Sequence, residues 1–217
     1  MAAVVAHPSA QPEAKPASPA SGTWGNSAPL GLAAFAVTTF MLSMINAKLM
    51  PAAITPVVFG VALMYGGLTQ LIAGIIQFRT GNTFTGVLFS TFGAFWLSLF
   101  AIVEFYLKDI QGPTLPATTA MHGQALGLYL YAFGIFTVMI LIASFRTNIV
   151  VVVALAGLAA TLFVLGAGNY YGSGLTIETG GYMGLAVAAL AAYLSVAELC
   201  EASYKRPILP LWPLARH

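Results

Sequence analysis

Long apolar runs constrain this chain more than any other feature of its sequence. Each run has about 20 residues, the length that an α-helix needs to cross the hydrocarbon of a bilayer. Period-two alternation, which marks a membrane β-barrel, is absent. The sequence therefore predicts an all-α integral membrane protein with six transmembrane helices. The runs lie near residues 27–46, 54–76, 84–107, 124–145, 149–168 and 180–200.

The composition agrees with a membrane solvent. Of 217 residues, 59% are hydrophobic and only 6% are charged, whereas soluble domains carry about 25% charged residues. The net charge of +2 and the scattered basic residues argue against a nucleic-acid partner. Cys200 is the only cysteine, so no intrachain disulfide or cysteine metal site is expected.

The sequence lacks the residue patterns that enzyme active sites commonly require. The chain has no nucleotide-binding glycine-rich loop, no metal-ligand cluster and no paired acid and base within the spans. No cofactor, no metal and no catalytic residue is therefore expected.

Three parts can be distinguished along the chain. Residues 1–24 are rich in Ala, Pro and Ser and lack the basic segment and apolar core of a secretory signal, which predicts a disordered cytoplasmic leader. Residues 25–204 hold the six spans. Residues 205–217, KRPILPLWPLARH, contain three prolines and predict an extended cytoplasmic tail.

The positions of the basic residues predict the orientation. Six spans place both termini on one side, and cytoplasmic loops carry an excess of Lys and Arg. With the N-terminus inside, six of the eight basic residues face the cytoplasm. We therefore expect a multi-pass protein of the cell membrane with both termini cytoplasmic. The inside residues are Lys15, Arg79, Arg146, Lys205, Arg206 and Arg216, and the outside ones are Lys48 and Lys108.

The spans carry no charged residue near mid-membrane. Glu104 and Glu198 stand toward span ends, and His122 stands at the start of the fourth span. Proton-coupled pumps usually contain ionisable relays inside the bundle, so only Glu198 and His122 remain as candidates for proton coupling. Gln70 is costly to bury, which makes it a candidate for the transport pathway.

The stretch GNSAPLGL opens the first span. Asn26 fits an N-cap, and Pro29 would be the third helical residue, where its missing N–H costs nothing. Gly31, on the first turn, would allow a close approach to the helix backbone because it has no side chain. This pattern predicts a helix start with free N–H groups, a place that favours an anion. The alternative is simply a well-formed helix start.

GNSAPLGL also resembles the NPAPLGL signature of the acetate uptake transporter family, which includes the succinate–acetate permeases. Further motifs stand in the order that the family shows, and the resemblance covers roughly residues 25 to 206. These motifs are YGGLTQ at 65–70, GNTF at 81–84, FSTFGAFW at 89–96, GN at 168–169 and AYLSVAE at 192–198.

The resemblance implies six helices around a central pore in each protomer of a homohexamer. It implies passage of small monocarboxylates, chiefly acetate and sometimes succinate, by proton-linked symport or as an anion channel. The family's gate falls on Phe35, Phe92 and Leu158, and Ala191 matches a position tied to substrate size. The residues expected to bind substrate are Asn26, Ala28, Pro29, Leu30, Gly31, Leu32, Gln70, Asn82 and Thr83.

The depth of the three gate residues can be checked without the family. They lie roughly eight to ten residues from the cytoplasmic start of spans that run in the same direction, which corresponds to about 12–15 Å at the helical rise. That depth is near the middle of the hydrocarbon. Three side chains at one depth can form a ring, and an apolar ring can gate by dewetting.

The chain departs from the family pattern at two positions. Ser27 replaces the first proline of the signature, which a helix start tolerates. Phe92 stands where several relatives have tyrosine, so the gate loses a hydroxyl. This predicts a drier and slower gate, or a preference for more apolar acids.

Two other functions stay open at this point. A channel for ammonium, urea or water would need its own selective groups, and the sequence shows neither a paired-histidine pore nor twin Asn-Pro-Ala boxes. A membrane sensor or structural protein could bind acetate without moving it. The sequence favours transport, with acetate, related small carboxylates and the lipid bilayer as partners.

Overall fold

The computed structural model describes residues 24–214. Six helical segments in this range are long and apolar enough to cross a membrane, which confirms the predicted fold class. The leader predicted for residues 1–24 lies outside the described residues except for Trp24. The crossings are α1 (Ala28–Asn46); η1 (Ala52–Ile54), α2 (Thr55–Val61), η2 (Ala62–Thr69) and α3 (Gln70–Arg79); α4 (Thr83–Ala101), η3 (Ile102–Tyr106) and η4 (Leu107–Asp109); α5 (Leu115–Ser144); α6 (Ile149–Tyr170); and α7 (Gly174–Tyr204).

Polar caps define where four of the helices begin. At α4, the Asn82 side-chain oxygen accepts from the Thr85 N–H at 3.2 Å, which satisfies a donor of the first turn. Glycines with φ of +82° and +67°, Gly81 and Gly172, close the preceding α3 and α6. The turns RTGNT and YYGSG therefore end one helix and start the next. The other capping residues are Thr114 for α5, Asn148 for α6 and Ser173 for α7.

The connection between the third and fourth crossings is shorter than the sequence predicts. Residues 108–123 read as the longest loop, but α5 already begins at Leu115. Pro116 stands in its first turn, where a missing N–H is tolerated. The hydroxyls of Thr118 and Thr119 bond to carbonyls four residues earlier. Both threonines are thus accommodated in the helix because they bond to its own backbone.

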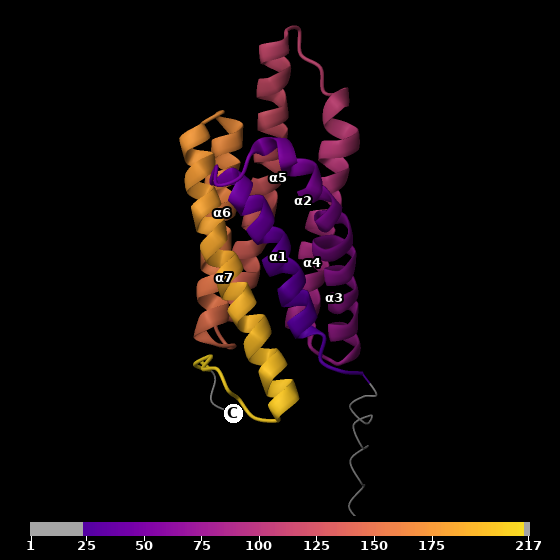
Figure 1. The fold of residues 1–217 in the computed structure, drawn as a ribbon, viewed down its shortest axis with the longest axis vertical. Helices are drawn as coiled ribbons and strands as arrows, with labels where there is room; N and C mark the ends of the chain where they lie inside the picture. Colours follow the sequence, from indigo (N-terminus) through magenta and orange to yellow (C-terminus); the bar gives the residue numbers. More distant parts are fainter. Residues whose placement is uncertain (1–23, 215–217) are drawn as a thin grey trace, which may run out of the picture.

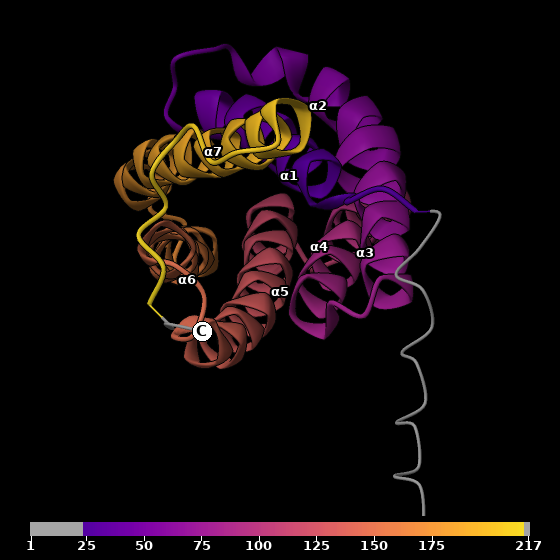
Figure 2. The same ribbon diagram turned by 90° about the horizontal axis from the view of Figure 1, so that it is seen from below.

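The crossings surround a common centre. Figure 2 shows α1, α4, α5, α6 and α7 around it, with α2 and α3 at the periphery beside α1 and α4. The start of α5 and the end of the third crossing project beyond the other helices at one end of the molecule (Figure 1). The ionic pair Lys48–Glu178, with Nζ and Oε2 2.8 Å apart, links the end of α1 to α7.

Small residues let neighbouring helices approach closely. A Cβ on Gly181 of α7 would fall on the backbone of Ala47, just beyond α1. A Cβ on Gly127 of α5 would lie 2.9 Å from the carbonyl oxygen of Gly166 in α6. In lipid, such close packing replaces the hydrophobic force that holds helices together in water.

Residues 205–214, which follow α7, are non-helical and fold back against the loop between α5 and α6. Pro213 pairs with Asn148 in the loop between α5 and α6. The Leu214 N–H donates to the carbonyl of Thr147 at 2.9 Å, and the Tyr193 hydroxyl donates to the carbonyl of Pro210 at 2.8 Å. Figure 2 shows this segment running from α7 toward α6.

Candidate functional site

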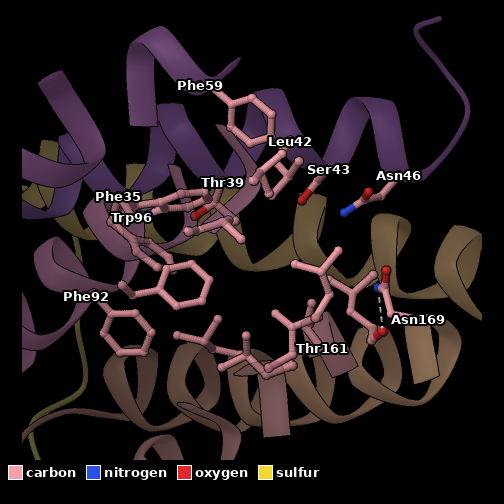
Figure 3. A pocket seen from close by; sticks show the side chains of 18 residues that line it. Phe35, Thr39, Leu42, Ser43, Asn46, Phe59, Phe92, Trp96, Thr161 and Asn169 are labelled. Carbon is pink, nitrogen blue, oxygen red and sulfur yellow. Dashed lines mark hydrogen bonds between the residues drawn. The ribbon is translucent and has the colours of Figure 1, made fainter. Parts of the chain in front are cut away.

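Two cavities lie between the helices that face the centre. We call the larger one, about 160 Å³, the outer cavity and the smaller one, about 50 Å³, the inner cavity, after the orientation predicted from the basic residues. Side chains of α1, α4, α5 and α6 form most of the outer cavity (Figure 3). The inner cavity is almost wholly apolar. Its lining is Leu32, Phe35, Gln70, Leu88, Phe89, Phe92, Val151, Ala154, Leu155, Leu158, Val187, Ala191 and Leu194.

The three predicted gate residues separate the cavities. Among the described residues, Phe35, Phe92 and Leu158 are the only ones that line both. The Phe35 and Phe92 rings meet edge to face, with centroids 5.5 Å apart, and all three side chains are buried. They are the eighth residue of α1, the tenth of α4 and the tenth of α6, which places them about 11–14 Å from the helix starts. The structure therefore brings the three together at one depth.

Unpaired polar groups line the outer cavity. The Thr39 hydroxyl and the Trp96 indole N–H are buried, and no described residue bonds to either. In contrast, the Thr161 hydroxyl and the Asn169 amide donate to carbonyls of their own helix, Gly157 and Leu165. Figure 3 shows Thr39 and Trp96 beside the Phe35 end of the cavity and Asn169 at the other end. Buried unpaired donors are costly, which marks them as places for a ligand or water.

Gln70 contributes the polar side chain of the inner cavity. It begins α3, directly after the π-helical segment η2, and its side chain is 1% exposed. No described residue bonds to its Oε1. Ala191 of α7 and Leu32 of α1 line the same cavity. Three residues predicted for substrate contact or selectivity, Leu32, Gln70 and Ala191, therefore lie around one cavity.

The start of α1 differs in detail from the prediction. The helix begins at Ala28, one residue later than expected, with Ser27 at the cap position. Asn26 still serves the helix end, because its Oδ1 accepts from the Ala28 N–H at 2.9 Å. That N–H is therefore not free. The Ser27 hydroxyl donates to the Ala73 carbonyl at 2.8 Å, and the Pro29 carbonyl accepts from Ser195 at 2.7 Å.

Gln77 of α3 closes the same helix end. Its buried amide lies 3.0 Å from the Ser27 hydroxyl and, with the oxygen toward α1, also accepts from the Ala28 N–H at 3.0 Å. On the other side, the Asn26 amide donates to the Glu198 carboxylate at 3.0 Å. A carboxylate of the chain itself thus stands near the positive end of the α1 dipole.

Comparison with known proteins decides the family. The family model described as GPR1/FUN34/yaaH matches residues 8–216. The chain belongs to the GPR1/FUN34/yaaH family. This agrees with the resemblance to acetate transporters seen in the sequence motifs.

Several members of this family are named as transport proteins. The succinate-acetate/proton symporter SatP of Escherichia coli K12 is 32% identical over 186 residues, covering 86% of this chain and 94% of that protein. The ammonia transport outward protein 2 of Saccharomyces cerevisiae is 38% identical over 177 residues, covering 78% of this chain and 60% of that protein. The structure of the bacterial acetate channel SatP matches with a TM-score of 0.77 and 30% identity, covering 87% of this chain and 99% of that one. These are transporters and channels, not enzymes.

The remaining residues predicted from the family signature lie outside the two cavities. Ala28, Pro29 and Gly31 are buried, and Gly31 packs against the Phe89 ring of the inner cavity. Leu30 is exposed and points away from the core. Asn82 and Thr83 are exposed at the start of α4, where Asn82 acts as the cap.

The two candidate proton-coupling residues are far apart in the fold. Glu198 lies in the last two turns of α7, beside the start of α1. His122 lies in the projecting part of α5, with its Nε2 3.0 Å from the Ile110 carbonyl. Neither lines the outer or the inner cavity. Because they lie at opposite ends of the bundle, the two do not form a direct relay with each other.

Several residues that line the two cavities were not predicted from the sequence. On α6 the lining residues recur every three or four positions and so share one helix face. This spacing was available in the sequence, but an apolar helix in lipid has apolar residues on every face, which hides the signal. The α6 face is formed by Val151, Ala154, Leu155, Leu158, Thr161, Leu162, Leu165 and Asn169.

Proposed function

We propose that this chain moves acetate and related small carboxylates, succinate among them, across the membrane. The observation that carries the proposal is the trio Phe35, Phe92 and Leu158, which within residues 24–214 alone lines both cavities. Two cavities joined by one narrow apolar neck form a path for a small solute. Relatives named as acetate and succinate transporters support acetate as the substrate.

The polar groups of the cavities suit a carboxyl group. A bare carboxylate loses much hydration energy in an apolar path unless donors replace water. The Trp96 N–H and the Thr39 hydroxyl can supply donors on the outer side of the neck. The Gln70 amide on the inner side can donate to a carboxylate or accept from a neutral acid. The neck itself offers only apolar surface and passes the solute by transient wetting.

The end of the bundle where α1 and α4 start is the proposed place of substrate entry from the cytoplasm. Residues Asn26–Leu32 lie at the start of α1, whose dipole favours an anion. Asn82 and Thr83 contribute exposed polar groups at the start of α4. Asn26 and Gln77 already bind the first N–H groups of α1. The substrate is therefore attracted by the dipole of α1 and by the polar side chains of Asn26, Asn82 and Thr83.

Proton linkage is proposed to act through Glu198. Its contact with Asn26 connects a titratable carboxyl group to the helix start that the substrate passes. A neutral Glu198 would remove a like charge from the path of an entering anion. His122 is the proposed counterpart at the opposite end.

The first test is electrical. Purified protein in a planar bilayer is held under an acetate gradient at symmetric pH. A current that reverses near the acetate equilibrium potential indicates that the anion conducts. Silence there, with acetate uptake into proteoliposomes only under a pH gradient, indicates proton-linked transport. Leu158→Trp, which fills the neck, should abolish either signal.

One outcome would contradict transport. If the purified protein binds acetate but adds no flux to liposomes under any gradient, the chain is a sensor or structural protein.

Ammonia is the second candidate substrate, because the Saccharomyces relative is named for it. A counterflow assay with acetate, ammonium and urea in the same proteoliposomes separates the two. Exchange of labelled acetate that only unlabelled short carboxylates stimulate supports the carboxylate path.

The proposed setting is the cell membrane, with both termini in the cytoplasm and six copies in the assembly. Arg79 is the last residue of α3 and Arg146 lies in the turn after α5, both at the end where α1 starts, and Lys48 and Lys108 lie toward the other end. In a Cys200→Ser background, an impermeant maleimide should label Asp109→Cys but not Thr80→Cys in intact cells. Native mass spectrometry in detergent should give six chains.

Replacing Gln70 by leucine should separate stability from function. The free energy of unfolding should rise by about 1–3 kcal/mol because an unpaired buried polar atom is removed. Acetate flux should fall about tenfold or more, since a hydrogen bond to a charged group contributes about 1.5–3 kcal/mol. Thermal unfolding in detergent and proteoliposome uptake measure the two effects. Gln124→Leu, at an exposed site on α5, is the control, and unchanged flux in Gln70→Leu would remove Gln70 from the path.

Restoring tyrosine at position 92 should favour acetate. The Phe92 ring packs edge to face against Phe35, Phe95 and Phe136. Because residue 92 and all three of these neighbours are phenylalanines, the neck has no hydroxyl there. Phe92→Tyr adds a hydrogen-bonding group and should raise acetate flux relative to butyrate several-fold. Phe100→Tyr, elsewhere on α4, is the control. Equal flux ratios in the unmodified chain and Phe92→Tyr would show that the hydroxyl does not set selectivity.

A further inference from the structure

The contact between α4 and α5 is built from aromatic rings. The two helices lie side by side (Figure 2). Phe92 and Phe95 of α4 face Phe136 and Phe133 of α5, with ring centroids 6.1 Å and 5.0 Å apart. Tyr129 stacks on Phe95 at 5.3 Å and with only 23° between the ring planes. The wall behind the neck residue Phe92 therefore consists of rings from two helices.

One polar group ties this wall together. The Tyr129 hydroxyl donates to the backbone carbonyl of Phe95 at 2.6 Å and lies 2.7 Å from the Ser98 hydroxyl. Across residues 24–214, these are the only side-chain hydrogen bonds that join α4 to α5. Interhelical hydrogen bonds and van der Waals packing hold helices together in lipid, where the burial of apolar faces supplies no hydrophobic driving force.

The position of Phe95 links this bond to the neck. Its ring contacts Phe92, with centroids 6.1 Å apart, and Trp96, with centroids 5.1 Å apart. Phe95 and Trp96 line the outer cavity, and Phe92 lines both cavities. A shift of α5 away from α4 would therefore remove the support behind Phe92 and widen the neck.

We infer that Tyr129 is a positioning residue that sets the width of the neck by holding α5 against α4 through the Phe95 carbonyl. Its effect on which acids pass rests on the proposed function. Its effect on the packing of α4 and α5 does not. Tyr129 itself contacts neither cavity, so it acts through Phe95.

The test uses Tyr129→Phe in the full chain, since this change keeps the ring and removes only the hydroxyl. The ratio of butyrate to acetate uptake should rise about threefold, the factor that one average interhelical hydrogen bond in a membrane corresponds to. A purely structural role would lower both fluxes together and leave the ratio unchanged. Tyr131→Phe is the matched control, because Tyr131 lies on the same helix and packs against Phe163 and Tyr170 of α6 instead.

A second measurement does not depend on transport. With Trp24 and Trp212 changed to phenylalanine, Trp96 is the only fluorophore of its kind. Trp96 is 2% exposed, and acrylamide quenching of its fluorescence should increase in Tyr129→Phe but not in Tyr131→Phe. Increased quenching supports the inference even if the unmodified chain carries no acetate, an outcome that would overturn only the proposed function. Unchanged quenching, or an unchanged uptake ratio in a transporting protein, overturns the inference.

Discussion

Replacing Phe35 by alanine is expected to raise the uptake of butyrate relative to acetate by about tenfold or more. Phe35 supplies one side of the neck, and its ring fills space against Phe92. One methylene in an apolar site changes discrimination by about 10–200-fold. Removing a whole ring should therefore relax the limit on acid length, while acetate, which already passes, gains less.

The measurement is uptake of labelled acids into proteoliposomes with matched protein content. Phe35→Leu should give an intermediate ratio and protects against loss of folding in the alanine variant. Val37→Ala, at an exposed position of the same helix, should leave the ratio unchanged. A ratio that stays constant in both Phe35 variants would mean that the neck is not where size is selected.

Replacing Gly93 by valine is expected to prevent assembly of the helix bundle. A Cβ at Gly93 of α4 would lie 2.6 Å from the backbone nitrogen of Leu71 and 2.8 Å from its Cα, in α3. Backbone atoms cannot turn aside as a flexible side chain can. Even alanine should cost about 1–3 kcal/mol by overpacking, and the branched valine more.

The yield of monodisperse protein and its thermal unfolding in detergent report this effect. Gly60→Ala is the matched control, since a Cβ there meets no atom within 4 Å. Helix propensity predicts that it stabilises α2 by up to about 1 kcal/mol. Normal yield and unfolding temperature for Gly93→Val would show that α3 and α4 are less closely packed than the structure has them.

The site was predictable in part. The resemblance to the family motifs implied the neck trio, and the equal depth of the three residues along helices that run in one direction agreed with it. Gln70 stood out because an amide in an apolar span needs a reason. Thr39 was one of several polar residues in the first span and was assigned no role, because a threonine can bond to its own helix, and Trp96 was not singled out because an indole is ordinary in a membrane. Only the structure shows that both groups lack a partner and line one cavity.

The sequence by itself determined the number of crossings, the polar residues that bound them and the absence of charge at mid-membrane. Hydrocarbon thickness and the cost of unpaired backbone N–H and C=O groups in lipid act on each segment separately. The tertiary structure decided which face of each helix looks inward, since lipid and a protein core accept the same apolar side chains. It also decided that Asn26, Gln77 and Glu198 close the start of α1, and that α5 begins at Leu115 instead of after a long loop. Those outcomes depend on contacts between segments distant in the chain, which no local pattern records.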